Sequence, residues 1–190
     1  PLQPQLDAYA GIASASDVAR QLGWAHAHVV GAGFVAFPGP DARNSALTIL
    51  QLMQGGLGLP DRDFYTRTDT NSVAIRAAHV ANIAQALTYA GSRDAAREAG
   101  WVLGLEEKLA AASMTNVQRR DPNATYHKVS IDTLRAWTPG FDWAAYARGR
   151  GMTLPDSMNV AQPGFFRALA RLVASEPLEE RFRRRHAHAK

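Results

Sequence analysis

Two consecutive helical segments, each with its own start and stop signals, constrain the fold of this 190-residue chain most strongly. The first is predicted from about Asn71 to Ala90 and ends at Gly91, because glycine tolerates the left-handed backbone that commonly closes a helix. Ser92 can cap the second segment, which continues to about Ser113. A connection this short brings the two helices side by side and antiparallel. The sequence therefore predicts a helical hairpin within a mainly α fold.

Shorter elements are predicted on both sides of the helical hairpin. One small β-hairpin is expected near residues 33–53, where Pro38-Gly39-Pro40 favours a turn between two β-compatible runs. Residues 115–128 show no periodicity and are predicted to form a loop, and a short extended piece is expected at 157–160. Further helices are predicted from their caps or first prolines: from Ser14 or Ser16 to about Val30, from Ser130 to Trp137, from Asp142 to about Arg148, and from Pro163 to about Ala174.

The segment between the β-hairpin and the helical hairpin carries the most informative motif. Residues 54–65 read Gln-Gly-Gly-Leu-Gly-Leu-Pro-Asp-Arg-Asp-Phe-Tyr. These glycines lack the Lys-Ser/Thr ending of a phosphate-binding loop, so they indicate a permissive exit from the β-hairpin into the next helix. The segment resembles the Gly-Leu-Gly-Leu-Pro-x-Arg-Asp-Tyr-Tyr motif of the neprilysin family of zinc metallopeptidases.

The resemblance to the neprilysin family extends over roughly residues 1–180. Its further matches, in the family's order, are the His-containing helix from His79 to Gly91, Leu105-Glu106, Arg119-Arg120-Asp121, Tyr126 and Phe141-Asp142-Trp143. The resemblance implies that residues 1–180 are part of the N-terminal helical domain, which covers the substrate chamber opposite the zinc domain. It also implies a periplasmic or extracellular location. Because animal members of the family are disulfide-rich, the complete absence of cysteine favours a bacterial source.

The chain lacks the catalytic centre of that family. Those enzymes bind zinc through a helical His-Glu-x-x-His, and this motif occurs nowhere in the 190 residues. No catalytic, cofactor-binding or metal-binding residue is therefore assigned, and the chain alone is expected to be inactive. The resemblance implies that the intact protein is a zinc metalloendopeptidase. Its cofactor would be zinc, and the partners of this chain would be the missing catalytic domain and peptide substrates.

The positive charge of the chain is concentrated at its C-terminal end. The formal net charge is +4, but residues 181–190 hold five of the 21 basic residues and no acidic residue. This segment is expected to be a disordered basic tail. The remaining 16 basic and 17 acidic residues give a net charge of −1, which offers no general field for nucleic acid. No apolar run is long enough to span a membrane.

For several residues that could bind a metal or contact substrate, a structural role is the favoured interpretation. His26 and His28 project about 200° apart on a helix, so they cannot share a metal ion. Asp61, Arg62 and Asp63 could contact substrate, but helix capping and ion pairing are favoured. Two further expectations concern packing: an ion pair of Glu106 with Arg119 or Arg120, and a core position for the aromatic group Trp137, Phe141, Trp143 and Tyr146.

Two functions from other classes remain open at this point. The chain could be a stand-alone, inactive binding module derived from such a peptidase. It could also bind nucleic acid or an anionic surface through the basic tail, and steep salt dependence that vanishes on deleting residues 181–190 would indicate this.

Overall fold

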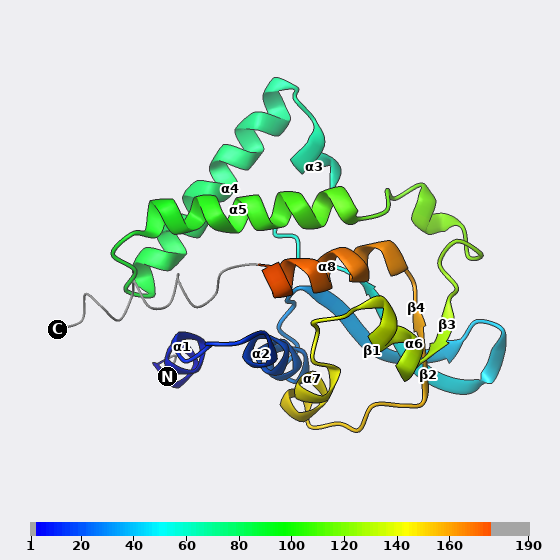
Figure 1. Cartoon of the computed structure of the whole chain (residues 1–190). Coiled ribbons are helices and arrows are strands. Elements are labelled where there is room, and N and C mark those ends of the chain that lie inside the picture. The colour runs from blue at the N-terminus through cyan, green and yellow to red at the C-terminus, as the bar shows by residue number, and fades with distance from the viewer. Residues whose placement is uncertain (1–2, 176–190) are drawn as a thin grey trace. The chain divides into compact units, whose positions relative to one another are not determined.

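Residues 3–175 of the chain are described by the computed structural model in Figure 1, and they belong to two units. Unit 1 combines the residues up to Gly55 with those from Tyr126 onward, and unit 2 is the intervening segment Gly56–Thr125. Most described residues are helical, with one small sheet, so the predicted fold class is confirmed. The predicted tail at 181–190 lies outside the described residues.

Unit 2 contains the predicted helical hairpin. Its elements are α3 (Asp63–Thr66), α4 (Thr70–Tyr89), α5 (Ala95–Ala112) and the short 3₁₀ helix η1 (Gln118–Arg120). Asp69 caps α4 by accepting the N–H of Ser72 at 2.9 Å. Gly91 has a φ of 85°, as expected for a residue that ends a helix. The hairpin prediction is confirmed.

The predicted cap of the second helix is wrong. Asp94 occupies the N-cap position of α5, two residues after Ser92. The oxygen of Ser92 accepts the N–H of Asp94 at 3.1 Å, while its hydroxyl donates to Glu98 at 2.8 Å. Ser92 therefore closes the turn between the helices and braces the first turn of α5 without being its cap.

Unit 1 is built on a four-stranded mixed sheet in the order β1-β2-β4-β3. The antiparallel pair β1 (Phe34–Asp41) and β2 (Asn44–Gln54) is the predicted hairpin, but the predicted turn at Pro38-Gly39-Pro40 is wrong. These residues continue β1 and the chain turns at 42–43, since prolines are tolerated at the outer edge of a sheet. β4 (Ser157–Val160) is the predicted extended piece, and it pairs in parallel with β2. The sequence did not predict β3 (Lys128–Ser130), because three residues show no periodicity; β3 and η1 revise the predicted loop at 115–128.

The outer edge of β1 is closed to further strands. Pro38 and Pro40 have no N–H, so they occupy positions of β1 whose main-chain groups face away from β2. Phe34 and Ala36 occupy positions of the same kind, because the direction alternates along the strand. The N–H of Phe34 donates to the carbonyl of Ala32 at 2.6 Å. The carbonyl of Ala36 accepts from the guanidinium of Arg150 at 2.9 Å. This edge therefore offers another chain few main-chain groups with which to pair.

The described part of unit 1 also contains five helices: α1 (Gln3–Ala10), α2 (Ala15–Ala27), α6 (Ile131–Trp137), α7 (Trp143–Arg150) and α8 (Pro163–Ser175). Ser14, Ser130 and Asp142 cap α2, α6 and α7 as predicted, each accepting a main-chain N–H three residues on. α1 was not predicted, since it buries no residue and has no apolar stripe. Caps are local signals, which explains why they could be read from sequence.

The core of unit 1 is an aromatic cluster around Phe34. Its ring lies 5.8 Å from that of Trp143, 5.3 Å from that of Tyr146 and 5.4 Å from that of Phe166, centroid to centroid. Trp143 also donates its indole N–H to Thr138 at 2.8 Å. The predicted core position is confirmed for Phe141, Trp143 and Tyr146, which are buried, whereas Trp137 is half-buried under the guanidinium of Arg167.

Candidate functional site

Glu106 is the centre of a buried polar cluster in unit 2. Its Oε1 accepts the N–H of Gly58 at 2.9 Å, and its Oε2 accepts the hydroxyl of Tyr65 at 3.1 Å. Nε2 of His79 lies 2.7 Å from Oε2, and a carboxylate only accepts, so this nitrogen carries the proton in the pair. The cluster ties the loop after Gly56, α3 and α4 to α5.

The predicted ion pair of Glu106 with Arg119 or Arg120 is wrong. The carboxylate faces α4 and is occupied by the three donors of the cluster. The guanidinium of Arg119 instead donates to the side-chain oxygen of Asn116 at 3.4 Å. The prediction joined Glu106 to residues that follow it in the chain, whereas its hydrogen-bond partners come from the helices and the loop that precede it.

Glycine is required at position 58 by the same cluster. A Cβ there would overlap the ring of His79 and would lie 2.8 Å from Oε1 of Glu106. The next residue, Leu59, donates its N–H to the Tyr65 hydroxyl at 2.9 Å. Burial raises the pKa of Tyr65 to about 12, so it remains a hydrogen-bond donor at neutral pH. The glycine-rich segment is therefore a close-packed structural loop, as the sequence indicated.

The charged triplet after Pro60 braces the start of α3. Asp61 accepts the N–H of Asp63 at 2.8 Å, and the carboxylate of Asp63 pairs with Arg67 at 3.2 Å. The predicted ion pairing is confirmed for Asp63, whereas the N-cap position belongs to Arg62, which makes no side-chain cap hydrogen bond. Among the described residues, Nε of Arg62 is buried without a hydrogen-bond partner.

His26 belongs to a hydrogen-bonded chain in unit 1 and not to a metal site. Its Nε2 lies 2.9 Å from the carbonyl of Ala32, and its Nδ1 lies 2.8 Å from the hydroxyl of Tyr146. A carbonyl only accepts, so Nε2 carries the proton and Nδ1 accepts from Tyr146, whose oxygen accepts from Arg150 at 2.8 Å. Burial lowers the pKa of His26, which favours this neutral form.

No candidate metal centre is found in the part of the chain that the structure describes, where no three His, Asp or Glu side chains gather. Nδ1 of His28 faces the carbonyl of Trp24 at 2.8 Å, whereas Nε2 of His26 faces Ala32, so the two histidines do not converge. No helix within residues 3–175 is long and apolar enough to cross a membrane.

Asp41 anchors a second polar cluster in unit 1, which sequence reasoning missed. This buried carboxylate accepts from Nζ of Lys128 and from the hydroxyl of Tyr126, both at 2.8 Å, and from the N–H of Arg43 at 3.0 Å. The hydrogen bond from Lys128 contributes most to lowering the pKa of Asp41 to about 2. The two side-chain partners, Tyr126 and Lys128, are more than 80 residues away in sequence, and no local signal identifies them.

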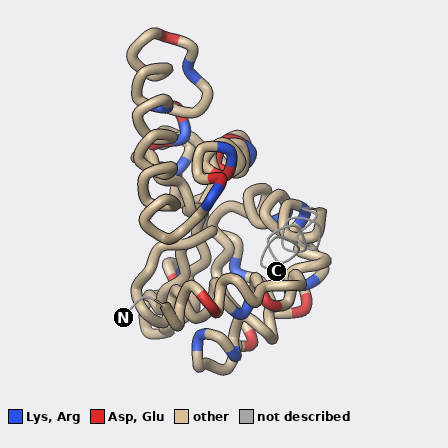
Figure 2. Tube along the Cα trace, turned by 90° about the vertical axis from the view of Figure 1, so that its left-hand side faces the viewer, with Lys and Arg blue, Asp and Glu red and all other residues tan. Residues whose placement is uncertain are grey.

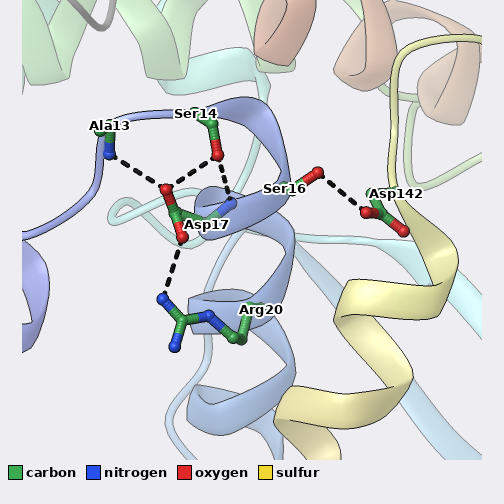
Figure 3. Close-up of polar contacts among 6 residues, drawn as sticks. All are labelled: Ala13, Ser14, Ser16, Asp17, Arg20 and Asp142. Carbon is green, nitrogen blue, oxygen red and sulfur yellow. Dashed lines mark hydrogen bonds and ion pairs between the residues drawn. The ribbon is translucent and has the colours of Figure 1, made fainter.

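The N-termini of α2 and α7 are joined by a hydrogen bond. Figure 3 shows the hydroxyl of Ser16 donating to the carboxylate of Asp142 at 2.8 Å, while Asp17 bonds Ser14 and Arg20 within α2. Hydrogen bonds from Ser14 and from the N–H of Ala145 lower the pKa of Asp17 and of Asp142, respectively. The two carboxylates offset the positive ends of two neighbouring helix dipoles.

In each of these clusters the carboxylate is hydrogen-bonded to a backbone N–H or to a side chain from a neighbouring element. The sequence matches the N-terminal domain of peptidase family M13 over residues 1–181, and the chain belongs to this family.

Solved and curated relatives agree with this assignment. The zinc metalloprotease ZMP1 of Mycobacterium tuberculosis, in complex with an inhibitor, is 31% identical with a TM-score of 0.83 over 95% of this chain, which covers 28% of that chain. Its open state gives 30% identity and a TM-score of 0.87, with 96% and 29% covered. Neprilysin-3 of Drosophila melanogaster is 28% identical over 71% of this chain and 18% of its own length. The chain thus spans less than a third of these relatives.

Proposed function

We propose that this chain is the non-catalytic N-terminal portion of a zinc-dependent metalloendopeptidase that hydrolyses peptides. The match to the N-terminal domain of family M13 across residues 1–181 carries this proposal. It is supported by the likeness to ZMP1, whose name describes a zinc metalloprotease, over nearly the whole chain. This chain covers only 28% of the ZMP1 chain. The proposed activity, substrates and partners are therefore those of a longer protein, of which this chain would be one part.

The role we propose for this chain is to form a wall of the substrate chamber. The polar clusters around Glu106, Asp41 and His26 hold together segments that are distant in sequence, which supports a structural role. A rigid wall restricts which peptides enter and helps to position them, which contributes to catalysis without touching the reacting atoms.

Zinc is proposed to bind outside this chain. The described residues do not fit the metal, because they offer no group of three ligands, and Nε2 of His79 is committed to Glu106. When bound, zinc would activate a water molecule and polarise the scissile carbonyl. The contribution of residues 3–175 is therefore structural in this proposal.

The experiment that tests the proposal begins with the reading frame of the gene beyond Lys190. A His-Glu-x-x-His codon run is expected downstream, in frame or after one shift. The longer product should hydrolyse a quenched fluorescent peptide, lose this activity with a chelator and regain it with zinc. The 190-residue chain should hydrolyse nothing at any zinc concentration.

Two results would overturn the proposal. One is a reading frame that ends without the motif, which would make an inactive binding module the leading function. The other is a folded, zinc-loaded longer product that cleaves no peptide in a diverse peptide library.

A further inference from the structure

α4 presents an uncharged surface along its whole length. Between Thr70 and Tyr89 the only Lys, Arg, Asp or Glu residue is Arg76. Its guanidinium is directed toward α3, where it donates to the carbonyls of Phe64 at 2.5 Å and Arg67 at 2.8 Å. In Figure 2, in which charged residues are blue and red, the tube of α4 is tan along most of its length. The rest of the helix is therefore without charge.

The two sides of α4 have different surroundings within unit 2. One side packs on α5, where His79 reaches Glu106, and on α3. The opposite side carries a row of exposed residues spaced four apart, which we call the outer ridge: Val73, Ala77, Ala81, Gln85 and Tyr89. Val73 is 48% exposed and Tyr89 is 81% exposed. A valine and a tyrosine thus stand at the two ends of an uncharged row.

The composition of α4 is that of a helix covered on more than one side. A helix that is apolar around its circumference is typical of a buried position, whereas a surface helix carries charged residues on its outer face. Residues spaced four apart form the ridge that packs into the groove of a second helix, and small side chains let that helix approach closely. The outer ridge has the four-residue spacing, and its middle positions, Ala77 and Ala81, have small side chains.

We propose that the outer ridge is the docking surface for an apolar helix from the remaining part of the M13 peptidase. The inference rests on the proposed function. Its occupant follows from length, because this chain covers only 28% of the ZMP1 chain while 95% of it is matched there. Most of such a protein lies outside the matched region, on the same polypeptide. A contact within one polypeptide needs no charges to guide the encounter, which agrees with the uncharged ridge.

Cysteine labelling tests the proposal directly, because the chain contains no cysteine. Ala81→Cys places one thiol at the middle of the outer ridge. Ala136→Cys, on the exposed face of α6 beside Arg135, is the matched control. Both variants are prepared in the 190-residue chain and in the longer gene product, and the rate of maleimide labelling is followed at each site by peptide mass mapping.

Labelling at position 81 is expected to be roughly tenfold or more slower in the longer product than in the 190-residue chain, since a covered thiol reacts only when the contact opens. Labelling at position 136 should be equal in the two. Equal rates at position 81 would overturn the proposal. So would slow, concentration-dependent labelling of the 190-residue chain, which would indicate that a second copy covers the ridge.

A charge on the ridge provides an independent measurement. Ala81→Glu should leave the melting temperature of the 190-residue chain unchanged but lower that of the longer product, while Ala136→Glu should change neither. Peptidase activity of the unsubstituted longer product tests the proposed function separately. A thiol protected at position 81 in a product without activity would reject the function and keep the interface. An active product in which the thiol at that position is freely labelled would do the reverse.

Discussion

Gly23 of α2 lies directly against the main-chain oxygen of Tyr146 in α7. A Cβ at position 23 would overlap that oxygen and would lie 2.9 Å from the N–H nitrogen of Arg150. Gly149 stands in the same relation to the carbonyl of Arg20 on the opposite helix. With Ser16 bonded to Asp142 at the helix starts, the two helices cross with their backbones in contact. This crossing admits no side chain at either glycine.

Gly23→Ala is expected to destabilise the chain by about 1–3 kcal/mol, because a rigid backbone must move to admit the methyl group. Gly164→Ala in α8 is the matched control, since an added Cβ there meets no atom within 4 Å. Alanine at that helical position should stabilise by roughly 0.5–1 kcal/mol. Urea unfolding of both variants provides the comparison, and equal effects would contradict the close crossing.

Removing the acceptor of the buried cluster should be costly. Glu106→Ala leaves the N–H of Gly58 and the Tyr65 hydroxyl without their acceptor, and the expected loss is about 2–4 kcal/mol from the unpaired donors and the lost packing. Hydrogen exchange at the Gly58 amide should accelerate in the same variant. Arg119→Ala and Arg120→Ala should leave both measurements unchanged. A large effect of either substitution would indicate that the ion pair with Glu106 forms after all.

Acid should weaken the chain through His26. Its pKa in the folded state lies below the value near 6.5 that it has when unfolded. Between these two values the unfolded chain binds more protons, so the free energy of unfolding rises with pH. Neutral His26 therefore contributes its full stabilisation at a pH above the unfolded-state pKa. This stabilisation is lost as the pH falls from the unfolded-state pKa to the folded-state pKa.

The urea midpoint between pH 8 and pH 5 measures this dependence. His26→Gln should be less stable at pH 8 but should show a shallower decline with acid than the unsubstituted chain. His28→Gln, on the exposed C-terminal end of α2, should leave the slope as it is. The same slope in the His26 variant would show that another group is responsible.

Val29 occupies a backbone conformation that suits glycine. Its φ is +60° and its side chain is 93% exposed, at the position where α2 ends. The N–H of Val30 reaches back to the carbonyl of Ala25 at 2.8 Å, which fixes this turn. Left-handed backbone costs a residue with a Cβ about 1–2 kcal/mol.

Val29→Gly should therefore raise stability by about 0.5–1 kcal/mol, since part of the relieved strain is offset by the greater entropy of glycine in the unfolded chain. Val30→Gly, which has no positive φ to relieve, should lower stability. Thermal melts of the two variants give the sign directly, and a loss of stability in the first would show that the valine side chain makes a contact that outweighs the strain.

The features that the sequence predicted are those whose signals are local. Ser14, Ser130 and Asp142 each cap the helix that they immediately precede. The β-hairpin was also predicted, although its turn was misplaced at Pro38-Gly39-Pro40, which continue β1. The polar clusters were not predictable, because Glu106 meets Gly58 across 48 residues and Asp41 meets Lys128 across 87. Which donor satisfies a buried carboxylate depends on how elements pack, and that information is not contained in any one segment.

The closed edge of β1 has a consequence for how copies of this chain behave at high concentration. Polymerisation by strand addition needs a free row of N–H and C=O groups on one chain to serve as a template for the next. At the edge of β1 few such groups remain, because Pro38 and Pro40 have no N–H, Phe34 donates its N–H to Ala32, and the carbonyl of Ala36 accepts from Arg150. The opposite edge is β3, with only three residues. Fibril growth from the folded sheet is therefore disfavoured at both of its edges.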